Sequence, residues 1–196
     1  LLADGRAAQI VVETAGESTL ETDILELITD HWHKVGIKLF IKTSQRDVFR
    51  SRAMSGDIMM TVWSGLENGI PTADMNPGQL APTSDDQLQW PLWGLHYMSS
   101  GFKGQPPEIP EALKLVELLG AWRKTTTAEQ RVQIWTDMLN IYSEEVFSIG
   151  IVNASLQPIL HASRLRNVPE KGLYGFDPTA FMGVYMPDTF WFAEEA

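Results

Sequence analysis

Hydrophobic and polar positions form three short strand-like runs in the first third of the chain. They cover residues 9–14, 37–42 and 57–63, and the third is mostly apolar, as in a strand covered on both faces. The two longer stretches between these runs repeat apolar residues at helical spacing. This order of strands and helices predicts a parallel sheet with right-handed crossover connections. The expected fold class is therefore α/β.

The two connecting stretches carry start and stop signals of helices. Residues 18–21 read Ser-Thr-Leu-Glu, which fits a capping box, and Gly36 follows the last turn. A second, shorter helix is expected over 45–55, ended by Gly56. The helix over 18–35 should bury one apolar stripe, made up of Leu20, Ile24, Leu27, Ile28, Trp32 and Val35.

The regular pattern stops at Trp63. Residues 64–110 hold seven of the eleven prolines and six glycines, so regular elements there should be brief. Ligands of open parallel sheets bind beyond the carboxyl ends of the strands, and Trp63 lies at such an end. A loop this long also favours a functional role over a simple connection. We therefore expect a ligand site to begin at Trp63.

The second half of the chain predicts two more helices and an irregular tail. The first helix should cover 111–124, and the second should follow the capping box at 127–130 as far as about Glu145. The second helix should bury a face made of Val132, Trp135, Leu139 and Tyr142. Residues 146–152 are expected to form a strand, and 156–160 another short extended piece. The tail, 163–196, has turn residues and six aromatic anchors, namely Phe176, Phe181, Tyr185, Phe190, Trp191 and Phe192.

Composition and charge narrow the function classes. The chain has 196 residues, a net charge of −10 and no cysteine. An acidic chain is a poor partner for nucleic acid or anionic lipid. The absence of cysteine excludes thiol nucleophiles, iron–sulfur clusters and cysteine-bound zinc. Residues 1–5 read Leu-Leu-Ala-Asp-Gly, like a final helical turn running into a glycine cap, so we expect this chain to be a fragment.

Several phrases, taken in their order, resemble the extracytoplasmic solute-binding proteins of ABC importers. The resemblance is to the group that takes up peptides, nickel and opines (solute-binding protein family 5). The phrases read Leu-Leu-Ala-Asp-Gly at 1–5, Val-Gly-Ile-Lys-Leu at 35–39, Ser-Gly-Asp-Ile at 55–58, Thr-Ala-Glu-Gln-Arg at 127–131, Phe-Ser-Ile-Gly at 147–150 and Arg-Asn-Val-Pro at 166–169.

The resemblance implies the parallel-sheet αβα lobe of a type II periplasmic-binding-protein fold. Residues 1–152 would form the C-terminal ligand-binding lobe, and 153–196 a return segment that packs on a first lobe outside this chain. The two lobes would close on a polar solute, a peptide or an oligosaccharide-like molecule, and deliver it to an ABC permease in the membrane. The implied location is periplasmic or extracytoplasmic, and the implied role is not enzymatic.

Six residues are candidates for contact with the solute: Trp63, Ser64, Glu67, Asn68, Trp90 and Trp93. Peptide-binding relatives commonly place an Asp shortly after the strand-ending Trp, where it pairs with the peptide α-ammonium group. Here that stretch offers Glu67 as its one carboxylate, whereas Trp90 and Trp93 suit a carbohydrate. Each of the three tryptophans has an alternative reading, in which it packs against the protein itself.

Motifs for catalysis and metal binding are absent from the sequence. There is no H-E-x-x-H, no G-x-S-x-G and no P-loop signature, and we expect no cofactor and no metal. His31 and His33 are two residues apart on a helix and point to different faces. The alternative from another class is a small α/β hydrolase with its active site at the same strand ends. Turnover of ester, glycoside or peptide substrates would separate this enzyme from a binding protein.

Overall fold

The computed structural model describes residues 2–63, 72–152, 156, 158–173 and 185–194. Its chain divides into two compact units. The first unit is Leu1–Trp63 with Ala81–Val116, and the second is Ser64–Leu80 with Glu117–Ala196.

The first unit is built on a parallel sheet of order β2-β1-β3. Strand β1 (Ala8–Thr14) pairs in parallel with β2 (Ile37–Thr43) along its whole length, and with β3 (Met60–Thr61) at its carboxyl end. The predicted sheet is therefore confirmed. The third strand is shorter than the predicted 57–63. The first predicted residue, Asp57, donates its N–H to the Arg52 carbonyl at 3.0 Å, so it completes the turn after a helix and does not join the ladder.

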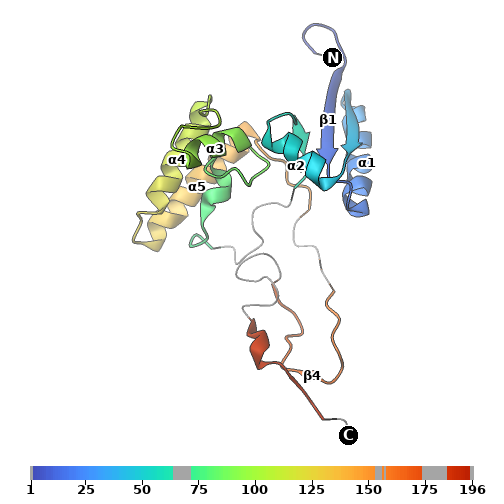
Figure 1. The fold of residues 1–196 in the computed structure, drawn as a ribbon, viewed down its shortest axis with the longest axis vertical. Helices are drawn as coiled ribbons and strands as arrows, with labels where there is room; N and C mark the ends of the chain where they lie inside the picture. The colour runs from blue at the N-terminus through green and yellow to red at the C-terminus, as the bar shows by residue number, and fades with distance from the viewer. Residues whose placement is uncertain (1, 64–71, 153–155, 157, 174–184, 195–196) are drawn as a thin grey trace. The chain divides into compact units, whose positions relative to one another are not determined.

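Helices cover the two faces of this sheet. Helix α1 (Thr19–Lys34) runs alongside β2 in Figure 1, and its Leu25 forms a core with Val12 and Leu39. Helix α2 (Arg46–Met54) lies against the other face, where Arg52 reaches Glu13, the next residue along β1 from Val12. The layers are therefore αβα.

Helix α1 begins and ends as predicted, but its buried stripe differs. The Ser18 side chain accepts a hydrogen bond from the Glu21 N–H, and Gly36 has φ +86° after the last turn. Trp32 and Ile28 pack against the core, whereas the predicted members Leu20, Leu27 and Val35 are 66%, 65% and 74% exposed. The prediction that Leu27 is buried is wrong, because Leu27 lies about 200° around the helix from the buried Leu25.

The proline-rich segment contains a helix that the sequence pattern did not predict. Helix α3 (Pro91–Met98) begins with a proline at its first position, which is a known start signal, and a 3-10 turn, η1 (Pro77–Leu80), precedes it. Phe49 and Ala53 of α2 pack with Leu88, just ahead of α3. A methyl group added at Gly56 would come within 3.0 Å of the Leu92 side chain, so this glycine also permits a close approach.

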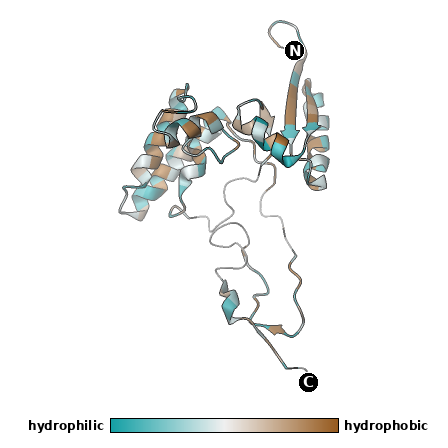
Figure 2. Cartoon of the chain, in the orientation of Figure 1, coloured by the Kyte–Doolittle hydropathy of each residue, from teal (hydrophilic) through white to brown (hydrophobic). Residues whose placement is uncertain are grey.

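Helix α4 (Pro110–Trp122) and helix α5 (Ala128–Glu145) match the predicted spans closely. The hydropathy colours of Figure 2 alternate along both helices, as in amphipathic helices. Within α5 the buried centre is Met138, which is fully buried, whereas the predicted members Val132 and Leu139 are about half exposed. The helix face that is buried is therefore rotated from the predicted one.

In the second unit, two tryptophans donate hydrogen bonds to the backbone of residues 73–75. The Trp122 indole N–H donates to the Ala73 carbonyl at 2.9 Å, and the Trp135 indole N–H donates to the Met75 carbonyl at 3.0 Å. Arg131 pairs with Asp74 between them. Half-buried indoles suit this role, because the ring packs while its N–H meets a carbonyl.

The strand predicted over 146–152 is wrong. Val146 ends α5 in a left-handed conformation, φ 52°, and residues 147–152 form no ladder. Ile149, Ile151 and Val152 are 48–62% exposed. An apolar run becomes a strand only where another strand pairs with it, and no strand of the described residues pairs with this run. The described residues of 156–160 carry no strand either.

The tail contains a two-residue antiparallel pairing between β4 (Leu165–Arg166) and β5 (Trp191–Phe192). A 3-10 turn, η3 (Pro187–Thr189), precedes β5, and the Arg164 guanidinium lies over the Phe192 ring at 5.0 Å. Of the predicted aromatic anchors, Phe176 and Phe181 lie outside the described residues.

Candidate functional site

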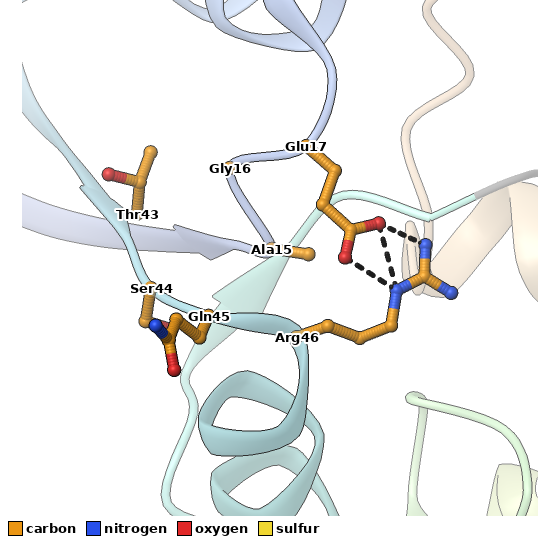
Figure 3. Close-up of a pocket in the computed structure, with 7 residues that line it drawn as sticks. All are labelled: Ala15, Gly16, Glu17, Thr43, Ser44, Gln45 and Arg46. Atoms are coloured by element: carbon orange, nitrogen blue, oxygen red, sulfur yellow. Dashed lines mark hydrogen bonds and ion pairs between the residues drawn. The ribbon is translucent and has the colours of Figure 1, made fainter.

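The candidate site lies at the carboxyl ends of the two long parallel strands. Beyond β1 and β2 the chain turns through two short loops into α1 and α2, as parallel connections require. These loops surround an open hollow with a volume of about 350 Å³. Figure 3 shows the seven residues that line it: Ala15, Gly16, Glu17, Thr43, Ser44, Gln45 and Arg46.

Backbone contacts hold the two loops together. The Ser44 N–H donates to the Thr14 carbonyl at 3.1 Å, and the Gly16 N–H donates to the Thr14 hydroxyl at 3.0 Å. Gly16 has φ +65°, and a methyl group there would lie 3.2 Å from the Thr43 Cβ. A glycine is therefore suited to this turn both by its conformation and by the close approach of β2.

An ion pair joins the loops across the hollow. The Arg46 Nε donates to both carboxylate oxygens of Glu17 at 2.8 Å, and its Nη2 binds the same carboxylate. The hydrogen bond from Arg46 lowers the pKa of Glu17, and Glu17 in turn raises the pKa of Arg46. Both side chains are about half exposed, so solvent can reach the pair.

Ser44 lines the hollow and has a buried side-chain hydroxyl. Among the residues that the structure describes, its hydroxyl oxygen is buried and has no hydrogen-bond partner. A buried hydroxyl left unpaired costs about 1–3 kcal/mol. A buried hydroxyl without a partner beside a hollow at the strand ends is a candidate for a hydrogen bond with a ligand.

A second ion-pair cluster lies near the strand ends, on the face of the sheet that α2 covers. Glu13 is 5% exposed and accepts from Arg52 at 2.8 and 3.0 Å, while the Lys42 ammonium lies 3.1 Å away. The Arg52 hydrogen bond, with Lys42 beside it, holds the pKa of Glu13 below its ordinary value despite burial. The cluster ties β1, β2 and α2 together just before the hollow.

The structure places three of the six predicted solute residues. Trp63 follows β3, is 49% exposed, and has the Arg50 guanidinium 6.0 Å from its ring. Trp90 and Trp93 stack on each other at the start of α3, with ring centroids 5.4 Å apart and an interplanar angle of 28°. Ser64, Glu67 and Asn68 lie outside the described residues.

The residues around the hollow were missed by the sequence interpretation. Glu17, Ser44 and Arg46 come after the first two strands, whereas the predicted site was placed after the third. The signal was present, because the rule that ligands bind beyond parallel strand ends applies to every strand of the sheet.

Metal clusters and membrane-spanning helices are both absent from the part of the chain that the structure describes. No group of three or more His, Asp or Glu side chains there is arranged to hold a metal ion. Within the same residues, no helix has both the length and the apolar character needed to cross a membrane.

Comparisons with known proteins give matches in structure alone. No protein-family model matches the chain, and no curated protein matches its sequence. The oligopeptide-binding protein OppA matches with a TM-score of 0.57 and 18% identity, over 75% of this chain and 25% of that protein. NikA from Brucella suis, solved in complex with Fe(III)-EDTA, matches with a TM-score of 0.52 and 17% identity, over 74% of this chain and 26% of NikA.

A third match is the periplasmic binding protein MelB from Agrobacterium fabrum C58, solved in complex with stachyose. Its TM-score is 0.56 at 14% identity, over 76% of this chain and 21% of MelB. The chain thus spans about a quarter of the length of the three proteins. OppA is described as an oligopeptide-binding protein and MelB as a periplasmic binding protein, and the fold expected from the sequence resemblance is confirmed: this chain has the α/β fold of part of a periplasmic binding protein.

Proposed function

We propose that this chain is the C-terminal lobe of the solute-binding component of an ABC importer, acting outside the cytoplasmic membrane. The observation that carries the proposal is the parallel β2-β1-β3 sheet with an open polar hollow at its carboxyl edge, in a fold shared with three solute-binding proteins. Strand ends of this kind are where open α/β sheets bind ligands.

The proposed solute is a polar small molecule, of the peptide or oligosaccharide class. The three similar proteins are described with an oligopeptide, a chelated metal and a tetrasaccharide, all of which combine polar groups with exposed carbon surface. The half-exposed Trp63 offers a rigid apolar wall at low entropic cost. Ser64, Glu67 and Asn68, with Trp90 and Trp93, complete the proposed set.

The proposed mechanism is closure without catalysis. A second lobe, outside this chain, would close over the solute by hinge motion, and the closed form would present the solute to the permease. Residues 153–196 would return to that lobe. Because closure removes water, each polar contact becomes worth more than it is in an open lobe.

The test is calorimetric titration of a two-lobe protein that contains this chain with a panel of oligopeptides and oligosaccharides. The two-lobe protein should bind one member at least about a hundredfold more tightly than residues 1–196 alone, a difference of about 2.7 kcal/mol. Equal affinity for the two proteins would reject binding by closure. Saturable turnover of a panel member would favour the hydrolase instead.

Trp63→Ala in the two-lobe protein tests the aromatic wall. Solute affinity should fall by more than about 1 kcal/mol, the range of a buried aromatic contact. Phe102→Ala is the matched control, because Phe102 is 90% exposed and lies after α3. Equal solute affinities for the two folded variants would reject the contact between Trp63 and the solute.

A further inference from the structure

The hollow between the two βα loops has the chemistry of an anion subsite. Arg46 stands at its rim with the guanidinium about half exposed, at the first position of α2. The N-terminal ends of helices carry a partial positive charge, and both α1 and α2 begin at this edge of the sheet. Gln45, the residue that caps α2, makes no side-chain capping hydrogen bond.

The Ser44 hydroxyl is a second, independent observation that favours a ligand at this hollow. It lines the same hollow, is buried, and has no partner among the described residues. Because its oxygen is buried, the Ser44 side chain has to turn about its Cα–Cβ bond to meet an incoming anion, and its proton then rotates freely about the Cβ–Oγ bond to donate.

Glu17 occupies the place that an incoming anion would take. Its carboxylate receives the Nε and Nη2 edge of Arg46, the geometry in which a guanidinium binds any carboxylate (Figure 3). Since the pair is half exposed, exchanging one carboxylate for another needs no opening of the core. Asp47 and Glu21 are also near enough to act on Arg46, so the resting site is not left with an excess of positive charge.

We infer that this hollow is a subsite for a carboxylate group of the solute, in which Arg46 exchanges Glu17 for the incoming carboxylate and the Ser44 hydroxyl donates to it. The inference rests on the proposed function, because it names an acidic solute for the same strand edge. It makes Arg46 and Ser44 residues that select the solute, and Glu17 an internal competitor that keeps affinity for single carboxylates low.

The experiment titrates the 196-residue chain with sodium acetate at pH 7 and follows the amide shifts of Gly16, Ser44 and Gln45 and the Arg46 Nε–H by NMR. Acetate should produce saturable shifts, whereas acetamide, its neutral analogue, and sodium chloride at equal ionic strength should not. Saturation with acetate and chloride alike would mean an adventitious ion only, and would overturn the subsite.

Variants separate exchange from a structural role. Glu17→Gln removes the competitor and should lower the acetate Kd at least about fivefold, the effect of one unit charge removed from about 4 Å in water. Asp30→Asn is the matched control, because it removes an equal charge from a weak pair with Lys34, near the other end of α1. Equal acetate Kd values for these two variants would overturn the exchange.

Arg46→Gln should abolish saturation by acetate, and Ser44→Ala should weaken it severalfold, in proteins whose circular dichroism is unchanged. If Glu17→Gln does not fold, retained saturation in Arg46→Gln still rejects the inference. Failure of acetate binding leaves the two-lobe proposal standing, because that proposal is judged by the affinity difference between the fragment and the two-lobe protein.

Discussion

At the residue scale, Glu13 shows how a charge is kept inside this small sheet. Its carboxylate is almost fully buried, but both of its cationic partners remain partly in water, with the Arg52 and Lys42 side chains 36% and 49% exposed. The partners therefore keep much of their hydration while the buried carboxylate is hydrogen-bonded. This arrangement keeps the carboxyl ends of β1 and β2 next to α2, where the hollow begins.

We predict that Glu13→Gln lowers the free energy of unfolding by about 1–2 kcal/mol at pH 7, the range for losing hydrogen bonds to a charged group whose partners can rehydrate. The folded-state pKa of Glu13 lies below its ordinary value of 4.5. Its stabilisation is therefore full above pH 4.5 and disappears as the pH falls through the lowered value. Urea denaturation of both proteins at several pH values measures the difference.

The control for this prediction is Asp30→Asn, because Asp30 forms an exposed pair with Lys34 at 3.9 Å. Its effect should stay within about 0.5 kcal/mol. A difference between wild type and Glu13→Gln that persists unchanged below the lowered pKa would show that charge is not its cause.

At the element scale, α5 shows that a helix is easier to predict than the face it buries. Thr127 accepts a hydrogen bond from the Gln130 N–H, as the capping box predicted, and the helix runs to Glu145. Its apolar residues are spread around much of the circumference, so several stripes compete for burial. The structure selects the one that contains Met138.

We predict that Met138→Ala destabilises the protein by about 2–4 kcal/mol, the usual cost of truncating a fully buried methionine. Val132→Ala, on the same helix at a position 54% exposed, should cost less than about 1 kcal/mol. Thermal unfolding followed by circular dichroism compares the two variants. A larger loss from Val132→Ala would show that the stripe predicted from the sequence is the buried one.

At the scale of the whole molecule, the first unit and the C-terminal tail differ in how much regular structure supports them. The first unit has a parallel sheet with helices on both faces, whereas the described tail residues, 158–173 and 185–194, have one two-residue strand pairing and a 3-10 turn. Trp191 and Phe192 of that pairing are 56% and 59% exposed. Exposed aromatics of this kind are typical of a surface that normally packs on another.

We predict that backbone amides at 158–173 and 185–194 exchange with solvent faster than those of β1 by at least about tenfold, because few of them are hydrogen-bonded inside a core. Hydrogen-exchange mass spectrometry on residues 1–196, with light scattering to report the mass, measures this. Strong protection of the tail in a clean monomer would contradict the expectation that it needs another surface.

Local signals in the sequence are sufficient to predict the long strands β1 and β2 and the helices α1, α2, α4 and α5. The caps at Ser18 and Thr127, the glycines at 36 and 56, and the alternation in 37–42 each act within a few residues. Such signals set backbone conformation directly, which is why the helix spans and the strands β1 and β2 formed where they were predicted. The resemblance to solute-binding proteins rests on the same order of elements.

Only the tertiary structure decides which surfaces meet. Residues 146–152 have the composition of a strand, yet without a partner strand they form none. Glu17 and Arg46 are 29 positions apart in the chain, and they face each other because β1 and β2 run parallel and end at one edge. Burial, pairing and ion-pair partners depend on such long-range contacts, since their free energy comes from groups that the local sequence does not contain.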